Sequence, residues 1–314
     1  MAAGSEAPPR ILCTGIIVLD EVFRVEHVPA PDTKVDARDF FVVNGGCAAN
    51  AAVAIARLGG RAMLAGPLGG PAGEDDNGDR VLAALKREHV DTSACPRIDG
   101  LATALSAIFI DARGDRTIVT YRDERIATAT LHDPDALVAT VDLVLADNRF
   151  PQFVRPICEA ARRRKLRVVL DADKPTVEDD PLFRIASHVV FSSECLCATT
   201  GRNDLAAGLE AIARHTGSFL AVSNGPHDIV FRQNFRDGPS LRRVPVFAID
   251  AVDTLGAGDA LHGGFALALA EGRSEAAALR FGAAAAGIKC SRMGGSAGAP
   301  KRVEVEAFLA AHPA

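Results

Sequence analysis

The chain contains 314 residues, with 35 Lys and Arg against 40 Asp and Glu, so its formal net charge is −5. A globular chain of this length buries roughly three quarters of its unfolded surface, so its core needs no disulfide or metal. The mildly acidic balance, without a block of basic residues, provides no electrostatic footprint for nucleic acid. One Tyr and no Trp also leave few aromatic platforms for single strands, so nucleic-acid binding is disfavoured.

Membrane insertion and secretion are disfavoured as well. No apolar run approaches the roughly 20 residues that cross a bilayer, and the first ten residues contain no apolar signal-peptide core. We therefore expect a cytoplasmic protein. Its seven cysteines include no C-x-x-C pair, and in a reducing compartment we expect them to be small buried hydrophobic residues.

Short apolar runs alternate with helical stretches along most of the chain. This pattern is typical of βαβ units and of a mostly parallel sheet that is buried on both faces. The predicted strands are Ile11–Leu19, Leu143–Ala146, Val168–Asp171 and Val189–Phe191. The predicted helices are Ala48–Leu58, Phe153–Lys165, Leu182–Ala186, Leu205–Thr216, Asp259–Ala270, Ser274–Cys290 and Val303–Ala311.

Two segments depart from this pattern, because each has one polar face. Residues 22–44 alternate charged and apolar side chains, and residues 103–122 contain a predicted hairpin, Ala104–Tyr121, whose turn carries Gly114. We predict that these two segments form a small β lid beside the main sheet. Residues 1–21, 45–102 and 123–314 are predicted to form the α/β core.

The most informative stretch is Ile249–Gly264, in which Gly256, Ala257 and Gly258 precede a helix that begins at Asp259. Three small residues leave backbone N–H groups uncovered at a helix N-terminus, which favours an anion. An aspartate in a first turn is ordinarily an N-cap, but here Asp253 and Asp259 flank the glycines and would repel a phosphate that is merely bound. A carboxylate is useful where a hydroxyl must lose its proton beside a phosphate, so the arrangement indicates phosphoryl transfer.

The same stretch resembles the C-terminal signature D-T-x-G-A-G-D of the ribokinase-like (PfkB) carbohydrate kinases. Gly45 and Gly46, followed by Asn50, resemble the N-terminal signature of that family. The resemblance implies a three-layer α/β/α fold with a mostly parallel central sheet and a small β lid. It also implies an ATP-dependent kinase that uses Mg²⁺ and phosphorylates a primary hydroxyl of a small sugar.

The resemblance also implies roles for individual residues. Asp259 would be the catalytic base, and Gly256, Ala257 and Gly258 would form the anion hole for the transferred phosphoryl group. Asp20, Gly45, Gly46 and Asn50 would bind the sugar, whereas Ser223, Gly225 and Thr254 would contact the nucleotide. Asp253 is a candidate ligand for K⁺, and the family resemblance implies a homodimer formed through the lid.

Within the family, Val144–Arg149 and Lys289–Pro300 are similar to stretches of the sulfofructose kinases. This similarity implies a ketose such as fructose or sulfofructose as substrate. Lys34 and Arg149 would face an anionic end of that substrate, because Arg offers a planar fork to a sulfonate or phosphate. Thr120 replaces an Asn of those kinases and would be a shorter hydrogen-bond donor to the substrate.

One departure from the family pattern leaves two alternatives open. The N-x-x-E motif that organises Mg²⁺ is replaced by Ser192-Ser193-Glu194-Cys195, so the Mg²⁺ ligands are unassigned. The change favours a catalytically silent sugar-binding regulator, although the presence of Asp259 argues against it. A nucleoside kinase of the same superfamily would share both signatures, but the low aromatic content disfavours it. We expect His262 to pack or to support a neighbouring residue.

Overall fold

A computed structural model describes residues 7–113, 116–235 and 238–313. Its centre is an eight-stranded sheet in the order β14-β13-β12-β11-β10-β9-β1-β4, in which the strands from β12 to β4 are parallel and β13 and β14 extend the sheet in antiparallel fashion. The strands are β1 (Arg10–Thr14), β4 (Arg61–Ala65), β9 (Leu143–Asp147), β10 (Arg167–Ala172), β11 (His188–Ser192), β12 (Phe219–Asn224), β13 (His227–Phe235) and β14 (Gly238–Val244).

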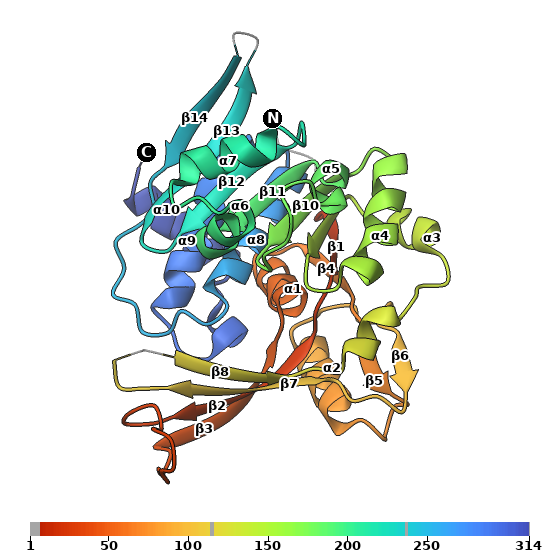
Figure 1. Ribbon diagram of the computed structural model, residues 1–314, viewed down its shortest axis with the longest axis vertical. Coiled ribbons are helices and arrows are strands. Elements are labelled where there is room, and N and C mark those ends of the chain that lie inside the picture. The colour runs from red at the N-terminus through yellow and green to blue at the C-terminus, as the bar shows by residue number, and fades with distance from the viewer. Residues whose placement is uncertain (1–6, 114–115, 236–237, 314) are drawn as a thin grey trace.

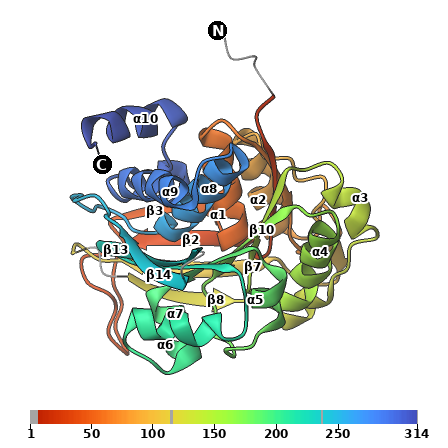
Figure 2. The same ribbon diagram turned by 90° about the horizontal axis from the view of Figure 1, so that it is seen from above.

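Helices cover both faces of this sheet (Figures 1 and 2). One layer consists of α1 (Cys47–Arg57), α2 (Asp76–Arg87), α8 (Ala257–Ala270), α9 (Glu275–Cys290) and α10 (Arg302–Ala311). The other consists of α3 (Pro134–Val138), α4 (Pro151–Arg163), α5 (Pro181–Ile185), α6 (Ser193–Thr200) and α7 (Leu205–Ala213). The predicted three-layer α/β/α architecture is therefore confirmed.

Alternate residues of each central strand belong to different hydrophobic clusters. In β9, Leu143 and Leu145 pack with the layer that contains α1, α8 and α9, whereas Val144 and Ala146 pack with the layer of α4 to α7. All four side chains are at most 2% exposed. Burial on both faces explains why these strands are continuous apolar runs in the sequence.

A second sheet forms the lid, in the order β3-β2-β7-β8, and lies at the lower end of the molecule in Figure 1. Its strands are β2 (Val18–Arg24), β3 (Asp39–Gly45), β7 (Ala104–Ile110) and β8 (Arg116–Tyr121). The predicted turn at Gly114 lies outside the described residues. A small third sheet pairs β5 (Leu68–Gly70) with β6 (Arg97–Asp99), and two 3₁₀ turns, η1 (Glu124–Thr128) and η2 (Gly295–Gly298), complete the structure.

The prediction of one strand over Ile11–Leu19 is wrong, because this run contributes to two sheets. β1 ends at Thr14, and β2 begins in the lid at Val18. Between them, Gly15 has φ +148°, and a Cβ at this position would lie 2.0 Å from the Asp147 carboxylate. That carboxylate accepts a hydrogen bond from the Ile16 N–H at 2.8 Å and so fixes the turn. Consequently Asp20 lies inside a lid strand and not at the end of a core strand.

Among the described residues, no helix is both long enough and apolar enough to cross a membrane. All seven cysteines are free thiols.

Candidate active site

The N-terminus of α8 places Asp259 beside Asn50 of α1. Asn50 Nδ2 donates to Asp259 Oδ2 at 2.8 Å. Asn44, at the end of β3, donates through Nδ2 to Asn50 Oδ1 at 3.3 Å and to Ser296 Oγ at 2.8 Å. An Asn side chain has one accepting oxygen and one donating nitrogen, so the contact from Asn44 holds Asn50 with its amide nitrogen toward Asp259. Asn44 and Ser296 were not among the predicted site residues.

The environment of Asp259 suits a general base. Burial raises the pKa of this carboxyl to about 7, against the opposing effect of the Asn50 hydrogen bond, and the negative charges of Asp173 and Asp147 raise it further. A base is most effective when its pKa lies near the operating pH, because it must both accept and release a proton. Asp259 therefore combines a fixed position with a suitable proton affinity.

The predicted anion hole is only partly available. Gly256 takes φ +78°, a conformation that glycine adopts readily, and α8 begins directly after it. The Ala257 N–H donates to the Thr254 carbonyl at 3.2 Å, so it is already engaged within the turn. The described residues provide no hydrogen-bond acceptor for the N–H groups of Gly256, Gly258 and Asp259, and no atom lies within 4 Å of where a Cβ on Gly258 would stand. These three N–H groups, two of them from the predicted anion hole, are the donors open to an anion.

Asp20, which was predicted to bind the sugar, lies in a row of polar side chains that crosses three lid strands. It is 6% exposed, and burial raises its pKa to about 6 against a hydrogen bond from Ser106. Ser106 on β7 lies beside Asp20 in the sheet register, and its Oγ lies 3.0 Å from Thr120 Oγ1 on β8. Thr120 is therefore connected to Asp20 through Ser106.

The two glycines at the start of α1 leave room for close contacts. A Cβ on Gly45 would lie 2.0 Å from Asp20 Oδ2, and one on Gly46 would lie 2.4 Å from the Ile16 carbonyl oxygen. Gly46 also has φ +91° at the N-cap of α1. Both positions therefore require glycine if Asp20 and the β1–β2 turn are to keep their places.

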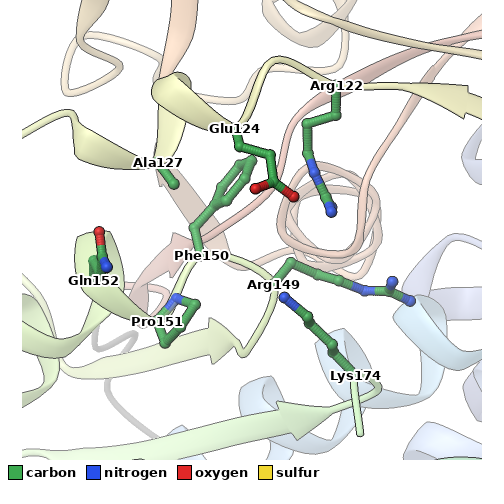
Figure 3. Close-up of a pocket in the computed structure, with 8 residues that line it drawn as sticks. All are labelled: Arg122, Glu124, Ala127, Arg149, Phe150, Pro151, Gln152 and Lys174. Atoms are coloured by element: carbon green, nitrogen blue, oxygen red, sulfur yellow. The ribbon is translucent and has the colours of Figure 1, made fainter. Parts of the chain in front are cut away.

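A cavity of about 220 Å³ lies between η1 and the start of α4 (Figure 3). Arg149 lines it and pairs with Asp173, and the side chains of Arg122 and Lys174 point toward Arg149. Within the described part of the chain, Arg122 and Lys174 have no ion-pair partner, and Glu124 is the one acidic residue that lines the cavity.

Lys34 does not line this cavity, although it was predicted to act together with Arg149. It is exposed in the loop between β2 and β3. Arg122 and Lys174 were not predicted, yet each directly follows a signal in the sequence. Arg122 comes immediately after the lid hairpin, and Lys174 follows two aspartates at the end of a buried strand.

Asp253, the candidate K⁺ ligand, already has a cationic partner. Lys289 Nζ lies 2.9 Å from Asp253 Oδ2 and donates to the Asp253 carbonyl oxygen at 2.7 Å. Lys289 is fully buried, and the N–H groups of Gly294 and Gly295 also donate to Asp253 Oδ2. Burial alone would raise the pKa of Asp253, but the contacts with Lys289 hold it below its ordinary value. The carboxylate that was predicted to bind K⁺ is therefore already paired with the Lys289 ammonium group.

The predicted nucleotide contacts lie at two separate places. Ser223 and Gly225 are at the end of β12, where Ser223 Oγ donates to the Phe191 carbonyl at 3.3 Å and Gly225 turns with φ +54°. Thr254, before α8, accepts a hydrogen bond from Arg116 of the lid strand β8. The structure therefore links Thr254 to the lid.

The altered N-x-x-E segment lacks a carboxylate at its fourth position. Ser192 caps α6 by accepting a hydrogen bond from the Cys195 N–H at 3.1 Å. Cys195 is fully buried, so it cannot offer a ligand where the family has a glutamate, and Glu194 is exposed on α6. Mg²⁺ prefers oxygen ligands, and these residues do not supply them in the expected place.

Comparison with known proteins identifies the family of this chain. A ribokinase from Bacillus subtilis is 27% identical over 304 residues, which cover 96% of this chain and 99% of the relative. An ATP-dependent ribose-1-phosphate kinase from Halopiger xanaduensis is 28% identical over 313 residues, covering 96% and 98%. The crystal structure of a candidate ribokinase from Agrobacterium tumefaciens superposes with a TM-score of 0.91 at 36% identity, covering 97% and 98%. The family model for pfkB family carbohydrate kinases matches residues 8–302, and the chain therefore belongs to that family of carbohydrate kinases.

Proposed function

We propose that this protein transfers the γ-phosphoryl group of ATP to a primary hydroxyl of a small sugar. The observation that carries the proposal is the position of Asp259, which Asn50 holds at 2.8 Å beside open N–H donors at the N-terminus of α8. A general base next to an anion-binding helix end is the arrangement that phosphoryl transfer to a hydroxyl requires.

In this mechanism, Asp259 accepts the proton of the sugar hydroxyl as the hydroxyl oxygen attacks the γ-phosphorus in line. The N–H groups of Gly256, Gly258 and Asp259 stabilise the charge that develops on the phosphoryl oxygens. Asp20 and Asn50 orient the sugar. The lid, which reaches Thr254 through Arg116, excludes water that would otherwise compete as acceptor.

ATP is the proposed donor, because the Halopiger relative carries ATP dependence in its name and a helix N-terminus suits a triphosphate. Ser223 and Gly225 at the end of β12 are the proposed contacts to the nucleotide. We propose that Mg²⁺ enters with ATP. No residue of this chain is assigned to it, because the segment from 192 to 195 does not fit.

The cavity beside Arg149 favours an acceptor that carries a negative charge, as a phosphorylated sugar or a sulfofructose-like ketose does. Arg122, Arg149 and Lys174 bring three positive charges to the cavity, against one negative charge from Glu124 in its lining and one from Asp173, which pairs with Arg149. The Halopiger relative is named for an anionic acceptor, ribose 1-phosphate. Neutral ribose and fructose are the competing acceptors.

We also propose a homodimer that forms through the lid, in a reducing cytoplasmic compartment that suits the free cysteines. Large apolar side chains are exposed on the lid strands: Phe40 on β3, and Ile118, Val119 and Tyr121 on β8. Exposed apolar patches of this kind mark interaction surfaces. Light scattering of the native protein and of Val119→Glu tests this proposal, with a monomeric native protein as the contradicting result.

The decisive experiment is Asp259→Asn, assayed for ADP release with Mg-ATP and a panel of ribose, fructose, ribose 1-phosphate, sulfofructose and nucleosides. Loss of a general base costs about 10²–10⁴-fold in rate. Asp250→Asn is the matched control, because it makes the same chemical change at an exposed position and should keep full activity. Turnover of Asp259→Asn at the native rate would refute the mechanism. ADP release with nucleosides alone would favour a nucleoside kinase, and no ADP with any acceptor would favour a silent regulator.

A further inference from the structure

Three side chains that can bind a transition metal form a cluster, and one of them is Asp259, the proposed catalytic base. Cys47 Sγ and carboxylate oxygens of Asp171 and Asp259 all lie within 4.8 Å of one another. Cys47 is the first residue of α1, Asp171 lies near the end of β10, and Asp259 is in the first turn of α8. The proposed proton transfer uses neither the thiol nor Asp171, so it does not explain why they are here.

A buried histidine borders this cluster. His262 is 4% exposed, and neither of its ring nitrogens makes a hydrogen bond of ordinary geometry with the described residues, although the backbone carbonyls of Gly258 and Val190 interact favourably with its ring. Its Nδ1 lies 3.5 Å from Asp171 Oδ2, which is longer than an ordinary N–H···O hydrogen bond. A buried polar group without a full hydrogen bond costs free energy, and a closer contact between His262 and Asp171 would reduce this cost.

The charge around the cluster favours a cation. Asp173 lies close by, with one carboxylate oxygen 4.0 Å from Cys47 Sγ, and Asp147 is buried behind the N-terminus of α1, where it accepts a hydrogen bond from the Ala48 N–H. Within the described part of the chain, the only cation paired with these four aspartates is Arg149, through Asp173, apart from the weak approach of His262. Nearby like charges oppose ionisation of a carboxyl group, and a dication among them removes that penalty.

We propose that Cys47, Asp171 and Asp259 bind a thiophilic divalent ion such as Zn²⁺, and that the bound ion inhibits the enzyme by occupying the base. A thiolate with carboxylates suits Zn²⁺, whereas Mg²⁺ prefers oxygen ligands alone. With Zn–S near 2.3 Å and Zn–O near 2.1 Å, the ligand atoms of a tetrahedral site lie about 3.4–3.7 Å apart. Side-chain adjustments of about 1 Å therefore close the site, and the Cys47 thiol releases its proton to solvent as it binds.

In this site, His262 would support Asp171 and would not itself bind the ion. When one oxygen of Asp171 binds the ion, the other can accept the His262 N–H, and a small shift shortens their 3.5 Å separation to a hydrogen bond. Such outer partners orient metal ligands, and their loss typically weakens metal affinity by roughly 10–100-fold. His262→Gln should therefore weaken binding without removing a ligand.

The binding test uses Co²⁺ as a spectroscopic probe on the purified full-length chain. We expect a near-ultraviolet charge-transfer band from thiolate to Co²⁺ that saturates at one ion per chain and is displaced by Zn²⁺. Cys47→Ser and Cys47→Ala should abolish the band, with folding checked by circular dichroism. The matched control Cys197→Ala, which changes a half-buried cysteine on α6, should retain it. A native protein without the band, or a band that survives both Cys47 variants, would overturn the proposal.

The inhibition part rests on the proposed function and is tested separately. Zn²⁺ should inhibit competitively with the sugar, a chelator should restore activity, and Cys47→Ser should need at least about tenfold more Zn²⁺ for the same fractional inhibition. If the Co²⁺ band depends on Cys47 but the protein phosphorylates no sugar, the proposed function is refuted and the metal site is supported. An active kinase without that band would refute the metal site alone.

Discussion

Asn44 holds Asn50 in the amide orientation that serves Asp259, because its Nδ2 donates to Asn50 Oδ1 at 3.3 Å. A flipped Asn50 would place its oxygen against the Asp259 carboxylate, and the two would repel each other. The hydrogen bond that Asp259 accepts is therefore set by a short series of polar contacts that begins in the lid strand β3. This connection suggests that lid position and base strength are coupled.

Asn44→Ala should weaken the hydrogen bond from Asn50 to Asp259 and so raise the pKa of the base. A hydrogen bond to a charged group contributes about 1.5–3 kcal/mol, and one pKa unit corresponds to about 1.4 kcal/mol. The midpoint of the rate against pH should therefore move upward, by up to about one unit, with a larger loss of rate at pH near 6 than near 9. Ser296→Ala, which removes the other contact of Asn44, should move the midpoint less. An equal loss at every pH would contradict this role.

The native enzyme should itself show a pH dependence that reports the ionisation of Asp259. Burial raises the pKa of this group to about 7, and only the ionised carboxylate can accept the hydroxyl proton. The rate should consequently rise with pH, reach half its maximum near pH 7, and level off above it. Measurement of kcat/KM between about pH 5 and 9 tests this. A rate that is flat between about pH 5 and 7 would mean that the base titrates at the ordinary value for an aspartate.

The sequence predicted the helices near the site better than it predicted the first strand. α1 and α8 carry apolar runs with glycines at their ends, and their bounds follow from these local signals. The division of Ile11–Leu19 into β1 and β2 depends on Asp147, which is 131 positions from Ile16 along the chain. Both halves of the run are buried, and an isolated glycine, Gly15, is the one local signal of the break. The antiparallel strands β13 and β14 and the short helix α6 were also missed.

The same distinction holds for the site. Asp259, Asn50 and the glycines at 256 and 258 follow from motifs, and the structure brings Asn50 and Asp259 together. The pairing of Asp253 with Lys289 joins the loop before α8 to the last turn of α9, 36 positions away. Lys289 lies in an otherwise Ala-rich helix, and only its complete burial shows that it is not a solvent-exposed lysine. Pairs that form through tertiary packing cannot be recognised from either residue alone.

Lys289→Met should make the enzyme less stable and newly responsive to K⁺. Removing one partner of a buried ion pair typically costs about 3–5 kcal/mol, because the other charge stays buried without compensation. K⁺ could then neutralise Asp253 in place of the ammonium group and recover part of the stability and activity. The native enzyme should not respond to K⁺ when compared with a non-binding organic cation. Thermal unfolding and initial rates test both statements, with Lys86→Met on the exposed face of α2 as the control. Strong activation of the native enzyme by K⁺ would show that Lys289 does not replace the ion.

Gly45→Ala should impair sugar binding more than it impairs folding. The added Cβ would lie 2.0 Å from Asp20 Oδ2 and would push the carboxylate away from its place beside Ser106. The KM for the sugar should rise about tenfold or more, which corresponds to about 1.4 kcal/mol of lost binding, while the KM for ATP stays unchanged. Gly217→Ala is the matched control, because no atom lies within 4 Å of its added Cβ. An unchanged sugar KM in Gly45→Ala would separate Asp20 from the sugar site.

Variants of the residues that line the cavity in Figure 3 should distinguish an anionic acceptor from a neutral one. Arg122→Ala and Lys174→Ala remove cations that have no ion-pair partner among the described residues, whereas Arg149 is held by Asp173. If the cavity binds a phosphate or sulfonate, each variant should raise the KM for the anionic sugar by roughly tenfold, because a hydrogen bond to a charged group contributes about 1.5–3 kcal/mol. The KM for a neutral sugar should stay within about twofold. Arg155→Ala, an exposed position on α4 that pairs with Glu159, controls for the general loss of positive charge. Equal effects on anionic and neutral sugars would show that the cavity lies outside the acceptor site, and a preference of the native enzyme for neutral ribose or fructose would rule out the anionic acceptor.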